Sequence, residues 1–60
     1  MRFDSFLAVC SYPLWVNIAG YAERYEDEET LMIDFPHYEY TVDYITVDGN
    51  GELTVEITEI

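Results

Sequence analysis

Basic side chains are the scarcest feature of this 60-residue sequence, which has no lysine and two arginines, Arg2 and Arg24. Thirteen acids oppose them, and the formal net charge at pH 7 is -11. An ordinary small domain carries a net charge of about 2–8 in magnitude. A surface this acidic repels nucleic acid and anionic membranes, which excludes both as direct partners and favours a strongly basic protein surface.

Cysteine and histidine are almost as scarce, with Cys10 and His37 as the single examples. One cysteine excludes a disulfide within the chain, and two soft ligands are too few for a structural zinc site, which normally has four. A catalytic Cys-His pair needs the thiol in a basic, partly exposed setting, whereas Cys10 lies in an apolar run of an acidic protein. We therefore expect a buried, reduced thiol and a surface histidine in a turn, with no enzymatic activity, cofactor or metal.

The sequence also lacks a hydrophobic run long enough to span a bilayer. Pro13 and Asn17 interrupt the mainly apolar stretch over residues 5–19. This stretch is a poor signal peptide, since Asp4 offsets the charge of Arg2 just before it. These features predict a cytoplasmic protein.

Apolar side chains are plentiful, since half of the residues are apolar and 17% are aromatic. A disordered acidic tail would be poor in such residues, and a chain of this length forms one domain over residues 1–60. A core of this size rarely supplies more than about 3–5 kcal/mol. Apolar groups that the core leaves exposed would form a self-association surface, so we also expect a homodimer.

The sequence Asp48-Gly49-Asn50-Gly51 is a strong turn signal between two β-rich runs, and it predicts a C-terminal β-hairpin. If Val47 faces Glu52 across this turn, Val42 faces Ile57 further along. This register sorts most apolar side chains, including Tyr44, onto one face and the acids onto the other, as in a half-buried antiparallel sheet. Ile45 and Val47 fall on the acidic face near the turn. The same register also pairs Thr46 with Leu53, Tyr44 with Val55 and Tyr40 with Glu59.

The pattern upstream of the hairpin predicts one more strand and one helix. Leu31, Ile33 and Phe35 alternate as in a strand. Residues 13–28 are expected to form a helix, because Pro13 suits a first turn and an apolar stripe follows at helical spacing. The prediction is an α+β fold, with one helix packed on a three-stranded antiparallel sheet that ends in the hairpin.

Two features leave an alternative open. Gly20 disfavours the expected helix, and the acids of residues 26–29 would lie at its C-terminus, where the helix dipole opposes negative charge. In the alternative, Leu14 to Ile18 form a strand and the protein is a small all-β sheet or barrel. Residues 3–10 fit either a strand or a short helix, because periodicity does not separate the two in so short a run.

Two groups of acids are the candidate partner-binding residues. One is a consecutive run, and the other lies on the outer side of the expected hairpin, where Asp43 would directly face Glu56. Like charges opposite each other across strands are unfavourable, which suggests a functional reason to keep them. Same-face residues on a strand repeat at roughly 6–7 Å, a spacing that fits a short run of phosphates. The eight residues are Glu26, Asp27, Glu28, Glu29, Glu39, Asp43, Glu52 and Glu56.

In size, charge and aromatic-rich β structure, the chain resembles the small acidic DNA-mimic proteins that phages and mobile elements make against host defences. The resemblance implies an inhibitor that occupies the basic groove of a nucleic-acid-binding protein. The alternative is a structural or assembly protein that forms a homo-oligomer, or docks on a larger complex, through aromatic anchors. Those anchors would be Trp15, Tyr21, Tyr25, Tyr38 and Tyr40.

Overall fold

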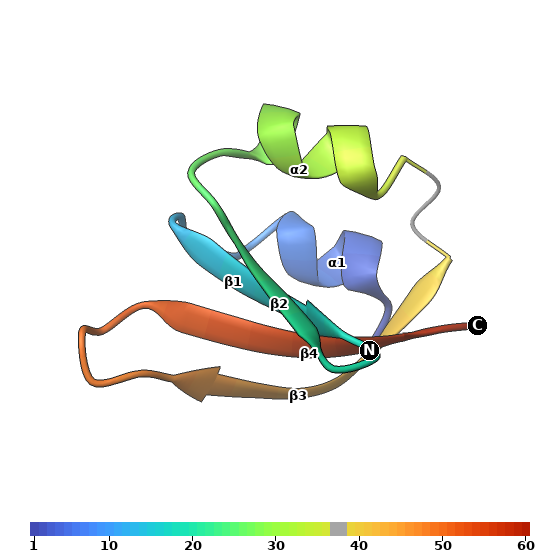
Figure 1. Ribbon diagram of the computed structural model, residues 1–60. Coiled ribbons are helices and arrows are strands. Elements are labelled where there is room, and N and C mark those ends of the chain that lie inside the picture. Colours follow the sequence, from blue (N-terminus) through green and yellow to red (C-terminus); the bar gives the residue numbers. More distant parts are fainter. Residues whose placement is uncertain (37–38) are drawn as a thin grey trace.

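The computed structural model describes residues 1–36 and 39–60 and has an α+β fold. Among these residues, two short helices lie on one side of four strands (Figure 1). Residues 3–10, which fitted either element, contain a helix. None of the described helices is long and apolar enough to cross a membrane. In chain order the elements are α1 (Phe3–Leu7), β1 (Leu14–Ile18), β2 (Tyr21–Tyr25), α2 (Glu28–Asp34), β3 (Tyr40–Val47) and β4 (Leu53–Glu59).

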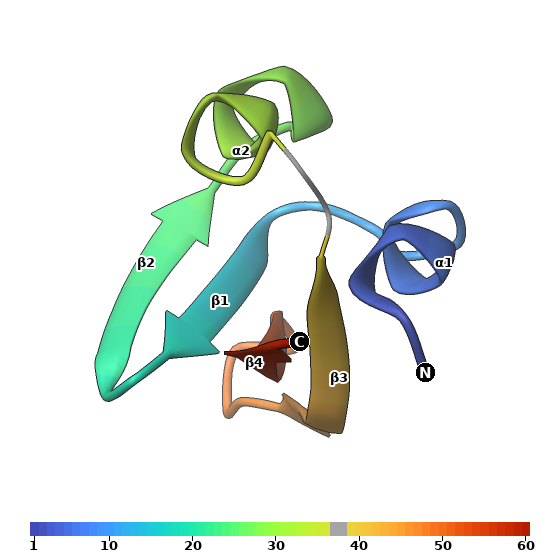
Figure 2. The same cartoon turned by 90° about the vertical axis from the view of Figure 1, so that its right-hand side faces the viewer.

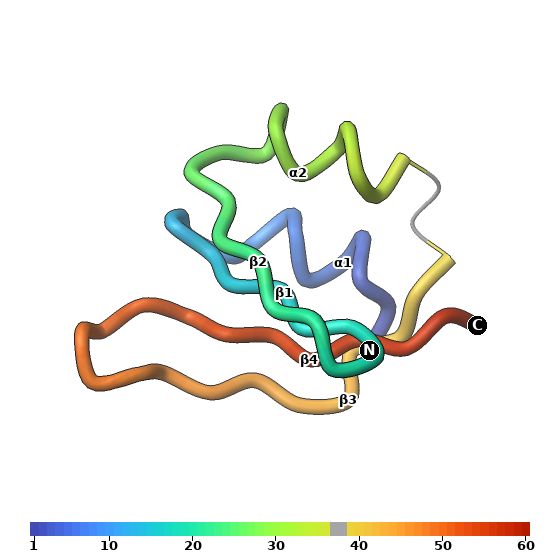
Figure 3. Tube along the Cα trace, in the orientation of Figure 1, coloured from blue at the N-terminus to red at the C-terminus, as the bar shows by residue number. Residues whose placement is uncertain are grey.

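The described strands form one mixed sheet in the order β2-β1-β4-β3. β1 pairs parallel with β4, whereas the hairpins β1-β2 and β3-β4 are antiparallel. Seen along the sheet, both helices lie over the same side of it (Figure 2). The Cα trace shows the turn of hairpin β3-β4 extending beyond both helices (Figure 3). The α+β prediction is confirmed, but the single helix and the three-stranded antiparallel sheet are wrong.

One apolar cluster fills the space between the helices and the sheet. Phe3 of α1 and Leu31 of α2 are completely buried. Phe35, just after α2, makes edge-on ring contacts with Phe3, Tyr25 and Tyr40 at centroid distances of 5.7, 6.0 and 5.4 Å. Edge-on contacts of this kind stabilise a core beyond the area they bury. The strands add Leu14, Val16, Val42, Val55 and Ile57 to the cluster.

Residues 13–28 contain the β1-β2 hairpin and not the expected helix. Ala19 and Gly20 form its turn with φ angles of 51° and 85°. Two consecutive positive φ angles are typical of the two-residue turns that connect tight hairpins, and the flanking residues pair directly. The alternative strand over Leu14–Ile18 is confirmed, although the all-β fold that accompanied it is wrong.

The expected strand at Leu31–Phe35 is also wrong, because this segment belongs to α2 and the residue after it. Asp27 is the N-cap of α2, and its carboxylate accepts the backbone N–H of Thr30 at 2.8 Å. Leu31 and Phe35 are buried, whereas Ile33 is 76% exposed. Burial therefore repeats every four residues, as in a helix, and not every two.

The C-terminal hairpin turns where the sequence predicts. The Asp48 carboxylate accepts the backbone N–H groups of Asn50 and Glu52 at 2.8 and 3.0 Å, which stabilises the turn. The predicted pairing of Val42 with Ile57 is confirmed. So is the pairing of Tyr40 with Glu59.

A β-bulge at Asp43 shifts the register of the hairpin by one residue from there to the turn. Tyr44, and not Asp43, faces Glu56, so the predicted opposition of two acids is wrong. The extra residue on β3 moves Ile45 and Val47 from the acidic face to the apolar face, which sorts the side chains better than the unbroken register. The pairs beyond the bulge are Ile45 with Val55, Thr46 with Thr54 and Val47 with Leu53, in place of those predicted.

Candidate partner-binding face

The side of the sheet opposite the helices, which we name the outer face, is covered by no described element. Side chains alternate along a strand, so Trp15 and Asn17 point to this face while Leu14 and Val16 point to the core. The register extends the outer face across all four strands. It consists of Ala22, Arg24, Trp15, Asn17, Glu52, Thr54, Glu56, Thr58, Thr41, Asp43, Tyr44 and Thr46.

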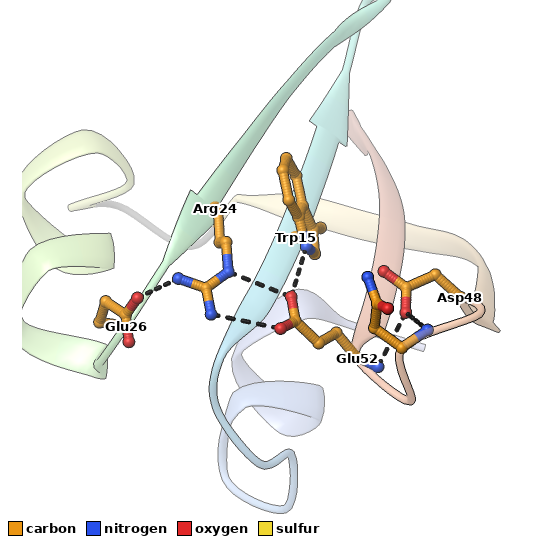
Figure 4. Close-up of polar contacts among 6 residues, drawn as sticks. Trp15, Arg24, Glu26, Asp48 and Glu52 are labelled. Carbon is orange, nitrogen blue, oxygen red and sulfur yellow. Dashed lines mark hydrogen bonds and ion pairs between the residues drawn. The ribbon is translucent and has the colours of Figure 1, made fainter.

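Glu52 connects β1 and β2 to the start of β4 (Figure 4). Trp15 Nε1 donates to its Oε1 at 2.8 Å, while Arg24 donates from Nε to Oε1 at 3.1 Å and from Nη2 to Oε2 at 3.2 Å. The Arg24 bonds first, and then the Trp15 bond, hold the pKa of Glu52 below its ordinary value. Arg24 forms a second ion pair with Glu26. The charge of Glu52 is therefore matched within the chain.

Asp43 and Glu56 also lie on the outer face, but their partners are uncharged. The Thr58 hydroxyl donates to Asp43. The Tyr44 hydroxyl donates to Glu56, which raises the pKa of Tyr44. A hydroxyl orients a carboxylate without neutralising it. Neither acid forms an ion pair with a described residue, so both leave their negative charge uncompensated on this face.

The run of four acids lies where β2 leads into α2. Glu26 pairs with Arg24, and Asp27 accepts a backbone N–H as the N-cap, which lowers the pKa of Asp27. Glu28 and Glu29 are exposed in the first turn of α2. The run therefore lies at the N-terminus of a helix, where the helix dipole favours acids. The expectation that it lies at a helix C-terminus is wrong. The run stabilises the start of α2, whatever partner it contacts.

The structure brings three of the eight candidate acids onto the outer face, namely Asp43, Glu52 and Glu56. The run over residues 26–29 belongs to the end of β2 and the start of α2. Glu39 precedes β3, at the end of the sheet away from the hairpin turn, where its carbonyl accepts a backbone N–H from the residue after β4 at 2.9 Å. The two predicted groups of acids are thus distributed over several parts of the molecule.

The sequence did not indicate that Trp15, Arg24 and Tyr44 lie beside the acids of the outer face. Trp15 and Arg24 fell within the expected helix, and Tyr44 was placed on the apolar side of the hairpin. In the structure Trp15 and Arg24 are register partners across β1 and β2. The dipeptide Ala19-Gly20 was the available signal, because a hairpin turn there places both side chains on one face.

The aromatic anchors of the alternative hypothesis are dispersed. Tyr25 is 3% exposed, and Tyr40 packs against the core. Tyr21 is 80% exposed, at the start of the edge strand β2, while Trp15 is half-buried on the outer face. Tyr38 lies outside the described residues. The four of these aromatics that the structure describes do not form one surface.

Both arginines are already paired within the chain. Arg2 Nε lies 3.2 Å from an Asp4 carboxylate oxygen, and Arg24 bonds both Glu26 and Glu52. The sequence has no lysine, and both arginines are engaged in these pairs. The remaining carboxylates therefore have no lysine or arginine to offset their charge. The field around the described residues is therefore negative.

The groups with potential for covalent chemistry are weakly placed for it. Cys10 is half-buried and not fully buried as expected, and its Sγ contacts the Leu7 carbonyl at 3.8 Å. Burial raises the pKa of this thiol, which disfavours the thiolate that a nucleophile needs. His37 lies outside the described residues. Among the residues that the structure describes, no three His, Cys, Asp or Glu side chains are grouped to hold a metal ion.

Comparisons with known protein families, with curated proteins and with solved structures found no match to this chain. The outer face is the feature with the clearest chemical character, because it combines oriented carboxylates with a surface that no described helix covers.

Proposed function

We propose that this protein is a non-enzymatic acidic inhibitor, which occupies the basic groove of a nucleic-acid-binding protein in place of DNA. The observation that supports this function is the uncompensated charge of Asp43 and Glu56 on the open outer face. The chain carries a net charge of -11, and both arginines are paired internally. A groove built to bind phosphates attracts such a surface and accelerates the encounter.

The orientation of the carboxylates favours this use. A side chain that is already held in place loses little freedom when a partner binds it. Asp43 accepts the Thr58 hydroxyl, and Glu56 lies directly opposite Tyr44 across the strands. The outer face therefore offers negative charge at fixed points, as a nucleic-acid backbone does.

The expected partners are nucleases, glycosylases, restriction enzymes and polymerases, all of which carry basic grooves. An anti-defence role, as in phages and mobile elements, follows from the resemblance in size and charge. The protein would act in the cytoplasm, where such enzymes handle nucleic acid. It would contact the protein partner and not the nucleic acid itself.

The test is a pull-down with the tagged protein from a nuclease-treated bacterial lysate, followed by washes of increasing salt. We expect a basic nucleic-acid-handling protein to be retained at low salt and released at high salt, because salt screens charge attraction. The double variant Asp43→Asn with Glu56→Gln keeps the side-chain shapes and removes two charges. It should retain much less of this protein.

The matched control is Glu28→Gln with Glu29→Gln, which removes the same charge from α2. If this control releases the partner and the outer-face variant does not, the contact lies at α2 and the outer face is not the binding surface. A partner that survives high salt contradicts the charge-based mechanism. Retention of no basic protein contradicts the function itself.

The second candidate function is homo-oligomeric assembly. It is supported by the 80% exposure of Tyr21, but Tyr25 and Tyr40 contribute to the core instead of a surface. Sedimentation of the purified protein distinguishes the two functions. An assembly protein forms oligomers larger than a dimer at high salt without any partner, whereas the inhibitor forms at most the expected homodimer until it meets a basic protein.

A further inference from the structure

β3 is an edge strand of the sheet, and the chain itself covers only part of its free edge. Arg2 forms an antiparallel bridge with Thr41, and the Val42 N–H donates to the Met1 carbonyl at 2.8 Å. From Asp43 to the turn, no described segment pairs with this edge. The N-terminal residues thus make backbone contacts along the first half of this edge, and they leave its second half open.

The backbone of this open half presents N–H groups to the free edge. The Asp48 N–H donates inward, to the Glu52 carbonyl at 3.0 Å. Because successive N–H groups point to opposite sides of a strand, the N–H of Val47 and that of Ile45 point away from β4. Two outward N–H groups, spaced as in a ladder, are what an additional strand needs.

Three side chains of the open half are large, hydrophobic and exposed. Tyr44, Ile45 and Val47 are 56%, 41% and 63% exposed. The turn of this hairpin extends past both helices, which explains why the helices do not cover it (Figure 3). An exposed, apolar edge strand tends to pair with another chain unless charges or a cover prevent it. The opposite edge strand, β2, is protected by charged residues, with Glu23 and Arg24 near its middle.

Charge decides what pairs with this edge. Asp43 and Asp48 flank the apolar residues, and Glu56 lies beside Tyr44 across the strands. A second copy of the chain would bring two net charges of -11 together, which disfavours this edge as the contact of the expected homodimer. A segment with lysines or arginines between its apolar residues matches both features of the edge.

We infer that the open half of β3 is a strand-addition site for an extended cationic segment of alternating basic and apolar residues. This inference rests on the proposed function, because the segment would belong to the basic partner. It adds a directional backbone contact to the attraction between charges. Backbone pairing gives affinity, and the alternating side chains give specificity.

The probe is a synthetic ten-residue peptide of alternating lysine and valine, added to the labelled protein at low salt. Amide hydrogen exchange, followed by NMR, should slow about tenfold at Ile45 and Val47, as expected when each N–H gains a hydrogen bond. The amides of Ala22 and Arg24 on the β2 edge should not change. A peptide N-methylated at both its lysines and its valines has the same charge but no N–H on either edge, and it should give no protection.

Two substitutions at one position separate backbone pairing from side-chain contact. Val47→Pro removes an outward N–H, which an edge strand tolerates, and should weaken peptide binding about tenfold. Val47→Thr keeps the N–H and the β-branched shape, and it should bind within about threefold of the wild type. Equal binding of the peptide by Val47→Pro and the wild type overturns the inference.

The outcomes also separate this inference from the proposed function. If Val47→Pro binds normally while Asp43→Asn with Glu56→Gln still loses the lysate partner, the inhibitor stands and the strand-addition site fails. If the Ile45 and Val47 amides are protected without peptide, and sedimentation shows a dimer, a second copy occupies the edge and the inference is wrong. If the peptide protects both amides but no basic protein is captured, the site stands and the inhibitor function fails.

Discussion

Single residues show that part of this unusual acidity serves the fold. Glu52 joins Trp15 and Arg24, and Asp27 caps α2. Both residues are candidates for partner binding by sequence, yet each has an internal partner. Asp43 and Glu56 differ because hydroxyls orient them without neutralising them. Counting acids therefore overstates the binding surface, and the identity of each partner group decides which acids are free to act.

Replacing Glu52 with glutamine should destabilise the fold in a pH-dependent way. Arg24 and Trp15 hold the pKa of Glu52 below its ordinary value of 4.5. The stabilisation is therefore fully present above that value and is lost as pH falls through the lower folded-state pKa. We expect Glu52→Gln to lower the thermal midpoint by a few degrees at neutral pH. The gap from the wild type should close as the solution is acidified towards pH 3.

The control for this titration is Glu59→Gln, which removes one charge from the far end of β4. It should leave the neutral-pH midpoint unchanged or slightly raised, since it relieves repulsion without breaking an ion pair to Arg24. Thermal melts followed by Trp15 fluorescence report both variants. A gap between Glu52→Gln and the wild type that persists unchanged at low pH would show that the Glu52 charge does not stabilise the fold.

At the scale of elements, the hairpin β1-β2 depends on two turn residues with positive φ. Gly20 adopts φ 85° freely, whereas Ala19 at φ 51° is in a region that β-carbons disfavour. We expect Gly20→Ala to lower the free energy of unfolding by about 1–2 kcal/mol. A β-carbon at Gly20 would meet nothing within 4 Å, so this loss would be conformational and not steric.

The converse change, Ala19→Asn, creates the Asn-Gly pair that such turns prefer. It should raise the free energy of unfolding by up to about 1 kcal/mol, because asparagine tolerates positive φ better than alanine. Chemical denaturation of the two variants measures both effects. A lower free energy of unfolding for Gly20→Ala together with a higher one for Ala19→Asn supports this turn. Stabilisation by Gly20→Ala would instead point to a helix at this position.

Sequence patterns predicted some of these elements for identifiable reasons. The Asp48-Gly49-Asn50-Gly51 turn was predicted because its residues have strong conformational preferences. The bulge at Asp43 was not, since a single inserted residue leaves little trace in an alternating pattern. The apolar residues of Leu31–Phe35 fit both the two-residue period of a strand and the four-residue period of a helix. A strand would bury Ile33 with Leu31 and Phe35, whereas a helix leaves Ile33 exposed, and the sequence does not show which occurs. The capping residue Asp27 was the overlooked signal for a helix.

The candidate site was predictable in composition but not in arrangement. The excess of acids is visible in the sequence, and three of the predicted residues, Asp43, Glu52 and Glu56, share the outer face. Their internal partners come from other strands, and the parallel pairing of β1 with β4 sets these contacts. Sequence separation hides such contacts, because no local pattern specifies which strands become neighbours.

Across the whole molecule, the net charge of -11 opposes folding through self-repulsion. Raising the salt concentration from about 0.01 M to about 1 M shortens the screening length from about 30 Å to about 3 Å. We therefore expect the thermal midpoint to rise with sodium chloride. A gain of about 1 kcal/mol corresponds to roughly 4–8 °C in a domain of this size. Differential scanning calorimetry at several salt concentrations measures the change.

The matched variant for this measurement is Glu39→Gln with Glu59→Gln. It lowers the net negative charge by two, so its midpoint should be higher at low salt and should respond less to added salt. If the wild-type midpoint falls as salt increases, the ion pairs of Arg2 and Arg24 outweigh the repulsion. The acidic surface would then have little energetic effect on the fold.

The position of β4 has a consequence for the order in which the molecule is made. It follows every other element in the sequence, yet it lies inside the sheet between β1 and β3. Leu14 gains its parallel partner only when Leu53 has emerged from the ribosome. Contacts between such distant residues slow folding. Until β4 is synthesised, β1 and β3 lack the strand that joins them, and the negative charge of the chain opposes aggregation during that interval.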